Sequence, residues 1–343
     1  MDTAQQVLEQ LQQAVRPLSG NQLAGQLKLS RTAVWKAVNK LRRSGIAIEG
    51  RPNSGYSLTE NKLDALTVNA VRCCLSQEAA SRAVISVIEN PGSTNEELLK
   101  ASAAGAPNYS CLIAPQQSAG RGRRGRAFYS PAGGLYLSML LRPHRLCAAD
   151  CRWLTITAAV AACEAVEELD IPDLPPVKIK WLNDLFINER KVCGILCEST
   201  QSIEDEYVSS VVVGAGFNLY PPEDLSTVPP DLKGRAYWIT DRQLKDGRAR
   251  LAALFINHLL AELLNFNKES IVRRYQERSC LIGRQVEIHS EDSVIEAQVI
   301  DIDAECRLNV RFKDGTRAKI RGGEVSLRPL PLQEPEQHLK EGL

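Results

Sequence analysis

The sequence predicts a multidomain α+β protein in which a small helical domain, a larger mixed α/β domain and a small β domain follow one another. Residues 1–65 show helical spacing of apolar residues and then a short hairpin pattern. Helical and strand patterns alternate over 66–275, and only short strand patterns remain over 276–332. Residues 333–343 form a polar tail.

The N-terminal domain has the pattern of a winged helix-turn-helix. Ser30 is a suitable N-cap for the last of three helices, and Gly45 marks the end of that helix. Residues 46–58 contain two short alternating runs around a turn-rich centre, which predicts a hairpin. The three helices are predicted over 4–15, 21–27 and 31–43.

The third helix has two chemically different faces. Val34, Ala37, Val38 and Leu41 follow helical spacing and should face the small core. The other face combines cations, hydrogen-bonding side chains and a tryptophan, which suits a DNA groove better than a solvated surface. We therefore predict DNA binding, and the alternative is a helical domain that docks onto a protein. The predicted DNA-binding residues are Arg31, Thr32, Trp35, Lys36, Asn39, Arg42 and Arg43.

The distribution of charge supports the same interpretation. Residues 1–65 carry nine Lys or Arg against five Asp or Glu, although the formal net charge of the chain is only +1. The basic excess therefore lies in the domain that is predicted to bind DNA.

The central domain contains a loop that is rich in arginine and glycine. Residues 120–126 read GRGRRGR and lie between two strand patterns. Glycine lets a ligand approach the backbone and arginine offers a planar fork of donors, so the loop predicts binding of a polyanion. Its Gly-x-Gly-x-x-Gly spacing is no dinucleotide fingerprint, because a strand pattern and not a helix follows. The alternative is an arginine loop that binds nucleic acid.

A second group of polar residues follows further along the central domain. Lys178 and Lys180 alternate with apolar residues and share one face of a strand, and Asn183-Asp184 predicts a turn into the next strand. Because a strand lysine is usually a solvated charge, composition leaves the role of Lys180 open. Gly214 and Gly216 end another strand and allow close approach of a ligand.

The C-terminal domain reads as short alternating strands. The patterns lie within 284–290, 294–305, 306–315 and 316–327, and Asp314-Gly315 is a hairpin signal. This is the texture of a small β-barrel.

Composition excludes several classes of protein. No apolar run approaches the about 20 residues that span a bilayer, and the N-terminus is polar, so we expect a cytoplasmic protein without a membrane partner. The ten cysteines include Cys193 and Cys197, whose spacing puts both on one strand face. Free, mostly buried thiols are favoured over a zinc site, so no protein-bound metal is predicted.

Taken together, the motifs resemble the bifunctional biotin-protein ligases that also act as biotin operon repressors. The matching stretches occur in the order of that family over nearly the whole chain. They are SGYSL (54–58), PGSTN (91–95), QSAGRGRRGR (117–126), KWLND (180–184), RKVCGIL (190–196), GAGFN (214–218) and GGEVSLR (322–328). One departure is Leu182, where the family usually has proline, and we expect leucine to loosen the aim of Lys180.

The resemblance implies a fold and a set of site residues. The central domain would resemble class II aminoacyl-tRNA synthetases and lipoate ligases, and the C-terminal domain an SH3-like barrel. Lys180, Arg121 and Arg123 would be catalytic. The biotin site would comprise Ser93, Thr94, Asn95, Gln117, Arg121, Gly122, Arg123, Lys180 and Gly194, and the nucleotide site Arg124, Asn183, Asn218 and Arg328.

The resemblance also implies the chemistry and the partners. Biotin and ATP would be substrates, with Mg²⁺ bound through the ATP phosphates. The products would be biotinyl-5′-AMP and then a biotinylated lysine of a biotin carboxyl carrier protein, and ligand binding would favour a homodimer on operator DNA. The alternatives are a DNA-binding biotin sensor without ligase activity and a lipoate-protein ligase.

Overall fold

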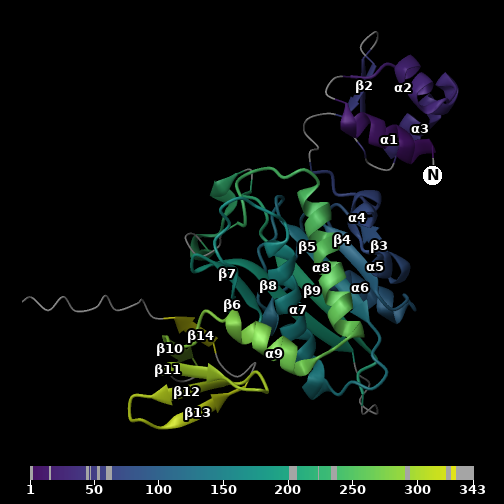
Figure 1. Cartoon of the computed structure of the whole chain (residues 1–343). Helices are drawn as coiled ribbons and strands as arrows, with labels where there is room; N and C mark the ends of the chain where they lie inside the picture. Colours follow the sequence, from purple (N-terminus) through teal and green to yellow (C-terminus); the bar gives the residue numbers. More distant parts are fainter. Residues whose placement is uncertain are drawn as a thin grey trace, which may run out of the picture.

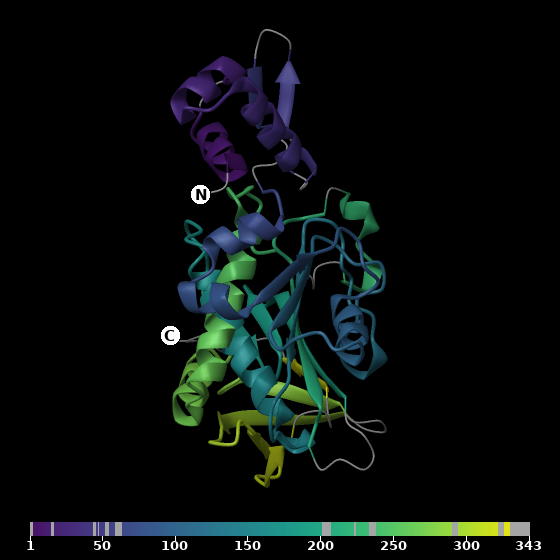
Figure 2. The same cartoon turned by 90° about the vertical axis from the view of Figure 1, so that its right-hand side faces the viewer.

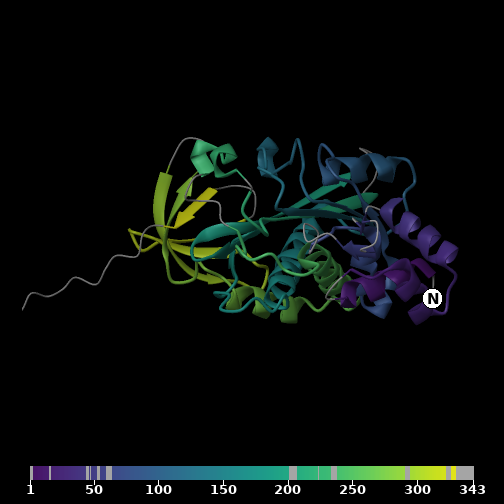
Figure 3. The ribbon, with the colours of Figure 1, turned by 90° about the horizontal axis from the view of Figure 1, so that it is seen from above.

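The computed structural model describes three folded parts that lie along one line, with the N-terminal and C-terminal domains at opposite ends of the central domain (Figure 1, Figure 3). The predicted fold class is confirmed. The described residues are 3–14, 17–43, 46, 48–51, 55–58, 64–200, 207–222, 224–232, 238–289, 294–321 and 326–329.

The N-terminal domain packs three helices against a hairpin. The predicted core residues Val34, Ala37, Val38 and Leu41 are all at most 5% exposed. Ser30 caps the third helix, since its Oγ accepts the Ala33 N–H at 3.1 Å, whereas Gly45 and the hairpin turn lie outside the described residues. The elements are α1 (Thr3–Gln13), α2 (Gly20–Leu27), α3 (Arg31–Arg43), β1 (Ile48–Arg51) and β2 (Gly55–Leu58).

The central domain is built on a seven-stranded sheet of order β3-β4-β5-β9-β8-β7-β6. Only the β3/β4 pair is parallel among the pairs that the structure describes. The strands are β3 (Val84–Val87), β4 (Ser110–Ala114), β5 (Leu135–Leu141), β6 (Lys178–Lys180), β7 (Asp184–Ile187), β8 (Arg190–Thr200) and β9 (Ser210–Phe217).

Helices cover both faces of this sheet (Figure 2). The long buried helix α7 and its neighbour α8 form the main core with one face, and α6 packs Leu98 against Leu112, Leu140 and Val212 on the other face. The site described below lies beside α6. The helices are α4 (Val68–Cys74), α5 (Gln77–Arg82), α6 (Thr94–Ala103), α7 (Cys151–Glu167), α8 (Gly247–Leu264) and α9 (Lys268–Glu277).

The C-terminal domain is a five-stranded antiparallel sheet of order β13-β12-β11-β10-β14. The predicted hairpin at Asp314-Gly315 joins β12 to β13. The polar tail lies outside the described residues. The strands are β10 (Gln285–His289), β11 (Val294–Ile302), β12 (Leu308–Phe312), β13 (Arg317–Ile320) and β14 (Ser326–Pro329).

A turn of the C-terminal domain is bonded to the central sheet. Trp181, which follows β6, donates its indole N–H to the Cys306 carbonyl at 2.8 Å. The turn that carries Cys306 is shaped by Asp303, whose Oδ1 accepts the backbone N–H groups of Glu305 and Arg307 at 3.0 and 2.9 Å. The C-terminal domain thus supports the strand end at which the KWLND motif begins.

The linker from the N-terminal domain is anchored at Asp64. This residue is 8% exposed, and its carboxylate accepts the Arg248 backbone N–H at 2.6 Å and pairs with the Arg248 guanidinium at 2.9 Å. The same guanidinium donates Nε–H to the Gly134 carbonyl at 3.0 Å. Gly134 precedes β5 and lines the site.

Candidate ligand-binding and active site

A cavity of about 1920 Å³ opens on the face of the sheet that carries α6. This is larger than the roughly 300–1,000 Å³ that one small ligand needs, so two ligands fit side by side. Its wall includes every predicted biotin-site residue and the predicted nucleotide residues Arg124, Asn183 and Asn218. Arg328 lies on β14, paired with Glu287, and its side chain lies outside the description.

One end of the cavity is a buried network of neutral polar groups at the N-terminus of α6. The Gln117 Oε1 accepts the Thr94 backbone N–H at 2.8 Å and the Thr94 hydroxyl at 3.1 Å. Gln117 Nε2 donates to the Ser130 hydroxyl at 3.0 Å. Ser93 takes the N-cap position of α6 but makes no side-chain cap bond and is only 2% exposed. Its hydroxyl therefore does not cap the helix, and the residue lines the cavity.

Ser138 on β5 belongs to the same network, although the sequence did not single it out. Its hydroxyl lies 2.7 Å from the Thr94 hydroxyl and 2.6 Å from Asn95 Oδ1, and it is fully buried. The Asn95 amide also donates to the Leu196 carbonyl at 3.2 Å. The groups of this network that line the cavity are neutral and already oriented by hydrogen bonds, and the Glu198 carboxylate accepts from Asn95 Nδ2 at 2.9 Å.

The arginine-glycine loop folds back on itself and begins no α-helix. The Gly122 N–H donates to the Arg126 carbonyl at 2.7 Å, and Arg121 forms an isolated bridge with Ala127. Gly120 is required, because a Cβ there would lie 2.3 Å from Ser130 Oγ. The structure thus supports the rejection of a dinucleotide fingerprint.

One arginine of the loop is bonded to β8 and another to the turn before β7. Arg123 donates to Asn183 Oδ1 at 2.8 Å, and Arg121 pairs with Glu198 at 2.9 Å. Burial lowers the pKa of the Arg123 guanidinium, and the nearby Asp184 carboxylate opposes that shift. Arginine stays charged in proteins, so Arg123 brings a partly dewatered positive charge to the cavity.

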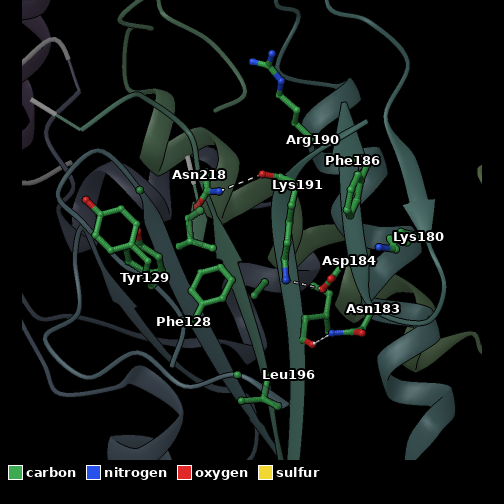
Figure 4. A pocket seen from close by; sticks show the side chains of 18 of the residues that line it. Phe128, Tyr129, Lys180, Asn183, Asp184, Phe186, Arg190, Lys191, Leu196 and Asn218 are labelled. Atoms are coloured by element: carbon green, nitrogen blue, oxygen red, sulfur yellow. Dashed lines mark hydrogen bonds and ion pairs between the residues drawn. The ribbon is translucent and has the colours of Figure 1, made fainter. Parts of the chain in front are cut away.

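Lys191, which the sequence did not single out, occupies the centre of the cavity (Figure 4). Its Nζ lies 2.8 Å from Asp184 Oδ1 and 5.4 Å from the centroid of the Phe128 ring. The predicted catalytic residue Lys180 also lines the cavity, but it lies beyond Asp184 with Nζ 5.3 Å from the Phe186 ring centroid. Geometry thus favours Lys191 as the central lysine.

Glycines on β8 and β9 make room for Phe128. A Cβ on Gly216 would lie 2.7 Å from the Phe128 ring, and one on Gly194 would lie 3.0 Å from that ring and 3.1 Å from Lys191 Nζ. Gly194 therefore serves the packing of the two side chains that a ligand meets. The predicted close approach at these strand glycines is made by protein side chains.

The cavity also has an apolar wall, made by the segment after β9. Asn218 holds the start of this segment, because its Nδ2 donates to the Lys191 carbonyl at 3.3 Å. An aromatic and aliphatic surface of this kind suits a nucleobase, and the sequence did not predict it. Its residues are Leu225, Val228, Leu232 and Trp238.

The turn of the KWLND motif is held by hydrogen bonds from outside the motif. The Leu182 carbonyl accepts the Tyr275 hydroxyl at 2.8 Å, and Asn183 Nδ2 donates to the Ile195 carbonyl at 2.8 Å. Leu182 itself is buried, and the Trp181–Leu182 peptide is cis. These bonds fix the turn without the rigidity of a proline ring.

Charge in the cavity is strongly positive. Nine Lys or Arg side chains line it against two carboxylates, Asp184 and Glu189. The described residues include no group of three His, Cys, Asp or Glu side chains that could hold a metal ion. The Asp184 carboxylate lines the cavity and is an oxygen ligand of the type that Mg²⁺ prefers, so it would suit a Mg²⁺ held mainly through phosphates.

The predicted DNA-binding residues lie on α3, but they are not equivalent. Arg31, Thr32 and Lys36 are exposed, Trp35 is 56% exposed and Asn39 is half-buried. Arg42 instead donates Nε–H to the Ile48 carbonyl at 2.9 Å and lies over the Tyr56 ring, so it anchors the hairpin. The side chain of Arg43 lies outside the description.

All ten cysteines are free thiols, and none of the described helices meets the length and apolarity that a membrane span requires. Four of the thiols are buried and Cys73 is exposed. Cys193 and Cys197 both lie on β8, as predicted.

Comparison with known proteins identifies the three domains. Residues 86–218 match the model of the biotin/lipoate A/B protein ligase family, residues 3–57 match an HTH domain, and residues 281–328 match the biotin protein ligase C-terminal domain. A solved structure of biotin protein ligase from Aquifex aeolicus in complex with biotin and ATP is similar, with a TM-score of 0.58 and 26% identity over 72% of this chain and 99% of that chain.

Curated relatives extend the similarity to the whole chain. The bifunctional ligase/repressor BirA of Escherichia coli (strain K12) is 34% identical over 316 residues, which cover 90% of this chain and 92% of that protein. The biotin acetyl-CoA-carboxylase ligase of Mycobacterium tuberculosis is 30% identical over 71% of this chain and 89% of that protein. Because the three domain matches and this identity span nearly the full length, the chain belongs to the biotin protein ligase family, among its bifunctional ligase/repressor members.

Proposed function

We propose that the protein is an ATP-dependent biotin-protein ligase that forms biotinyl-5′-AMP, transfers biotin to a lysine of a biotin carboxyl carrier protein, and represses biotin synthesis genes. One observation carries the enzymatic part. A single cavity combines a network of neutral hydrogen-bonding groups with a strongly cationic set of side chains that includes Lys191. This arrangement suits a neutral ureido ring, a carboxylate and a nucleotide phosphate in series.

The first step joins two anions. A carboxylate oxygen of biotin attacks the α-phosphorus of ATP, and the bond to the β-phosphate oxygen breaks, so pyrophosphate leaves with the bonding electrons. Lys191 and Arg123 offset the repulsion and hold the reacting groups in line, which is the positioning and electrostatic logic of phosphoryl transfer. Mg²⁺, when bound, neutralises charge on the leaving pyrophosphate.

The second step forms an amide. The neutral amine of the acceptor lysine attacks the carbonyl carbon of the adenylate, AMP leaves with the electrons of the C–O bond, and the nitrogen loses a proton to solvent. Because AMP is a good leaving group, the acceptor lysine can attack the adenylate directly. No covalent intermediate with the enzyme is needed. The Gly120–Arg126 loop covers the adenylate and keeps water from the mixed anhydride.

The N-terminal domain supplies the repressor activity. The exposed face of α3, with Trp35, Arg31 and Lys36, presents base-reading and phosphate-binding groups to operator DNA. Adenylate binding favours a homodimer, so that two such helices meet a palindromic operator in the cytoplasm. Accumulated adenylate then reports that no acceptor remains.

Labelled biotin separates the proposal from its alternatives. The purified protein should incorporate biotin into a biotin carboxyl carrier protein only with ATP, and lipoate should not replace biotin. Biotin binding without AMP formation would favour a sensor, and lipoate transfer would favour a lipoate ligase.

A further inference from the structure

We propose that Glu198 is a positioning residue that locks the arginine-glycine loop onto the polar wall of the cavity. Its carboxylate holds Arg121 with one oxygen and Asn95 with the other. The inference rests on the proposed ligase function, since it assigns how the loop that covers the adenylate is fixed. It also divides the two arginines predicted to be catalytic into one that anchors and one that contacts ligand.

Glu198 lies where strand alternation directs it toward the cavity side of the sheet. On β8, Gly194 and Leu196 line the cavity, and Glu198 is the next residue on that face. Cys193 and Ile195 face the core formed with α7. The Glu198 side chain is 20% exposed, so its carboxylate is only partly hydrated.

Each oxygen of this carboxylate has its own partner from a different element. Oε1 lies 2.9 Å from Arg121 Nη2, and Oε2 accepts the Asn95 Nδ2–H at 2.9 Å. Charge-assisted hydrogen bonds of this kind are about twice as strong as neutral ones. The carboxylate therefore links the loop, the first turn of α6 and β8 in one contact.

Both ends of the Asn95 amide are bonded to protein groups. Its Nδ2 donates to Leu196 and Glu198, and its Oδ1 lies 2.6 Å from the Ser138 hydroxyl. A Cβ on Gly214 would lie 2.1 Å from that same Oδ1, so β9 leaves space for this amide alone. Asn95 is 4% exposed. It is therefore part of the cavity wall and orients Glu198, and the biotin contact that the resemblance implies for it stays a prediction.

Arg121 is correspondingly an anchor of the loop. Its charge is neutralised by Glu198, whereas Arg123 lies at Asn183 near Asp184 and Lys191. Without the Glu198 charge, Arg121 would add to the repulsion among the loop arginines, and the closed loop would open more often. The predicted consequence is faster escape of adenylate with little change in its synthesis.

Glu198→Gln tests the ion pair alone, because the amide oxygen still accepts from Asn95. We expect it to release bound biotinyl-5′-AMP about tenfold faster, to leave the KM for biotin unchanged, and to change the rate of pyrophosphate formation by less than about threefold. Loop cleavage by trypsin in the presence of adenylate should accelerate in parallel. Glu97→Gln, which removes an exposed ion pair with Lys100 on the same helix α6, is the matched control and should behave as wild type.

Arg121→Gln tests the same contact from the other side. It should reproduce the faster release, and the Glu198→Gln/Arg121→Gln double variant should be no worse than either single variant. The assignment would be overturned if Glu198→Gln released biotinyl-5′-AMP at the wild-type rate. It would also be overturned if the effects of the two substitutions on the release rate were additive in the double variant. Failure of the wild-type protein itself to form adenylate would instead reject the ligase function, so the two failures are distinct.

Discussion

At the scale of single residues, the main question is which lysine contacts the ligands. The KWLND motif predicts Lys180, but Lys191 lies against Asp184 and Phe128. The sequence could not show that Lys191 reaches the cavity, because the direction of its side chain depends on how β8 pairs with β7. That pairing shifts register between Leu185 and Phe186, and a one-residue shift exchanges the two faces of a strand.

The first prediction compares the two lysines. Lys191→Met should slow adenylate formation by about 10²- to 10³-fold, since it removes a preorganised charge from the reacting phosphate. Lys180→Met should slow it by less than about tenfold, and Lys100→Met on the surface should have no effect. Pyrophosphate release measures all three, and equal losses at Lys180 and Lys191 would contradict the geometry.

The second prediction concerns the thiols. Burial raises the pKa of Cys111, Cys197 and Cys306 to about 12, so at pH 8 each is almost entirely protonated and unreactive. Iodoacetamide should modify the exposed Cys73 first. Peptide mass spectrometry over time would show the order, and rapid modification of Cys111 in the folded protein would be inconsistent with it.

At the scale of elements, the sequence predicted the helices and strands well but not what fills the space between them. Apolar periodicity and the glycine runs correctly located α3, α7, β9 and the C-terminal strands. The same pattern could not show that Gly216 faces Phe128, or that the segment after β9 walls the cavity with Trp238. Both contacts join residues distant in sequence, and no local pattern encodes them.

The third prediction tests the packing of β9. Gly216→Ala would place a Cβ 2.7 Å from the Phe128 ring and should push that ring into the cavity. We expect a loss of about 1–3 kcal/mol in stability and weaker biotin binding. Phe128→Leu in the same background should restore part of the binding, as measured by calorimetry. If the single variant had unchanged stability and biotin affinity, β9 would have to shift to accommodate the added methyl group, and the prediction would be wrong.

The fourth prediction concerns the turn between β11 and β12. Burial alone would raise the pKa of Asp303. Hydrogen bonds from the Arg307 backbone and guanidinium and from the Glu305 backbone outweigh burial and lower that pKa. Its contribution to stability is therefore complete above the pKa of the unfolded state, about 4, and is lost as pH falls through the lower folded value.

Asp303→Ala should destabilise the protein by about 1–3 kcal/mol at pH 7, and its difference from wild type should shrink in acid. The indole of Trp181, which donates to Cys306 in this turn, supplies a fluorescence signal for the unfolding. Asp150→Ala, which removes an exposed carboxylate that makes no cap bond to α7, is the control. A difference that does not depend on pH would contradict the role of the carboxylate.

At the scale of the whole molecule, the order of the three domains was predicted and is confirmed, but their mutual contacts were not. The sequence shows Asp64 as one acidic residue among several in a polar stretch. The structure places it in a buried ion pair with Arg248, which also contacts Gly134 at the cavity. Such a contact depends on tertiary packing, so the residues near Asp64 in the sequence do not predict it.

The fifth prediction tests the DNA-binding domain as a unit. Removing residues 1–62 should abolish operator binding while the ligase reaction continues, because the cavity residues all lie in the remaining part. Trp35→Ala in the full chain should weaken operator binding about tenfold or more without changing adenylate formation. Electrophoretic mobility shift and pyrophosphate assays give the two readouts, and unaltered operator binding by Trp35→Ala would reject its role.

The Asp64 anchor has a consequence for engineering and for evolution. If another DNA-binding domain were fused to this enzyme, an acidic side chain would be needed at the position of Asp64. Without it, the partly buried Arg248 guanidinium would lose its counter-charge. Chimeras that keep this carboxylate should fold and remain active. Chimeras that omit it should become less soluble before they lose catalytic activity.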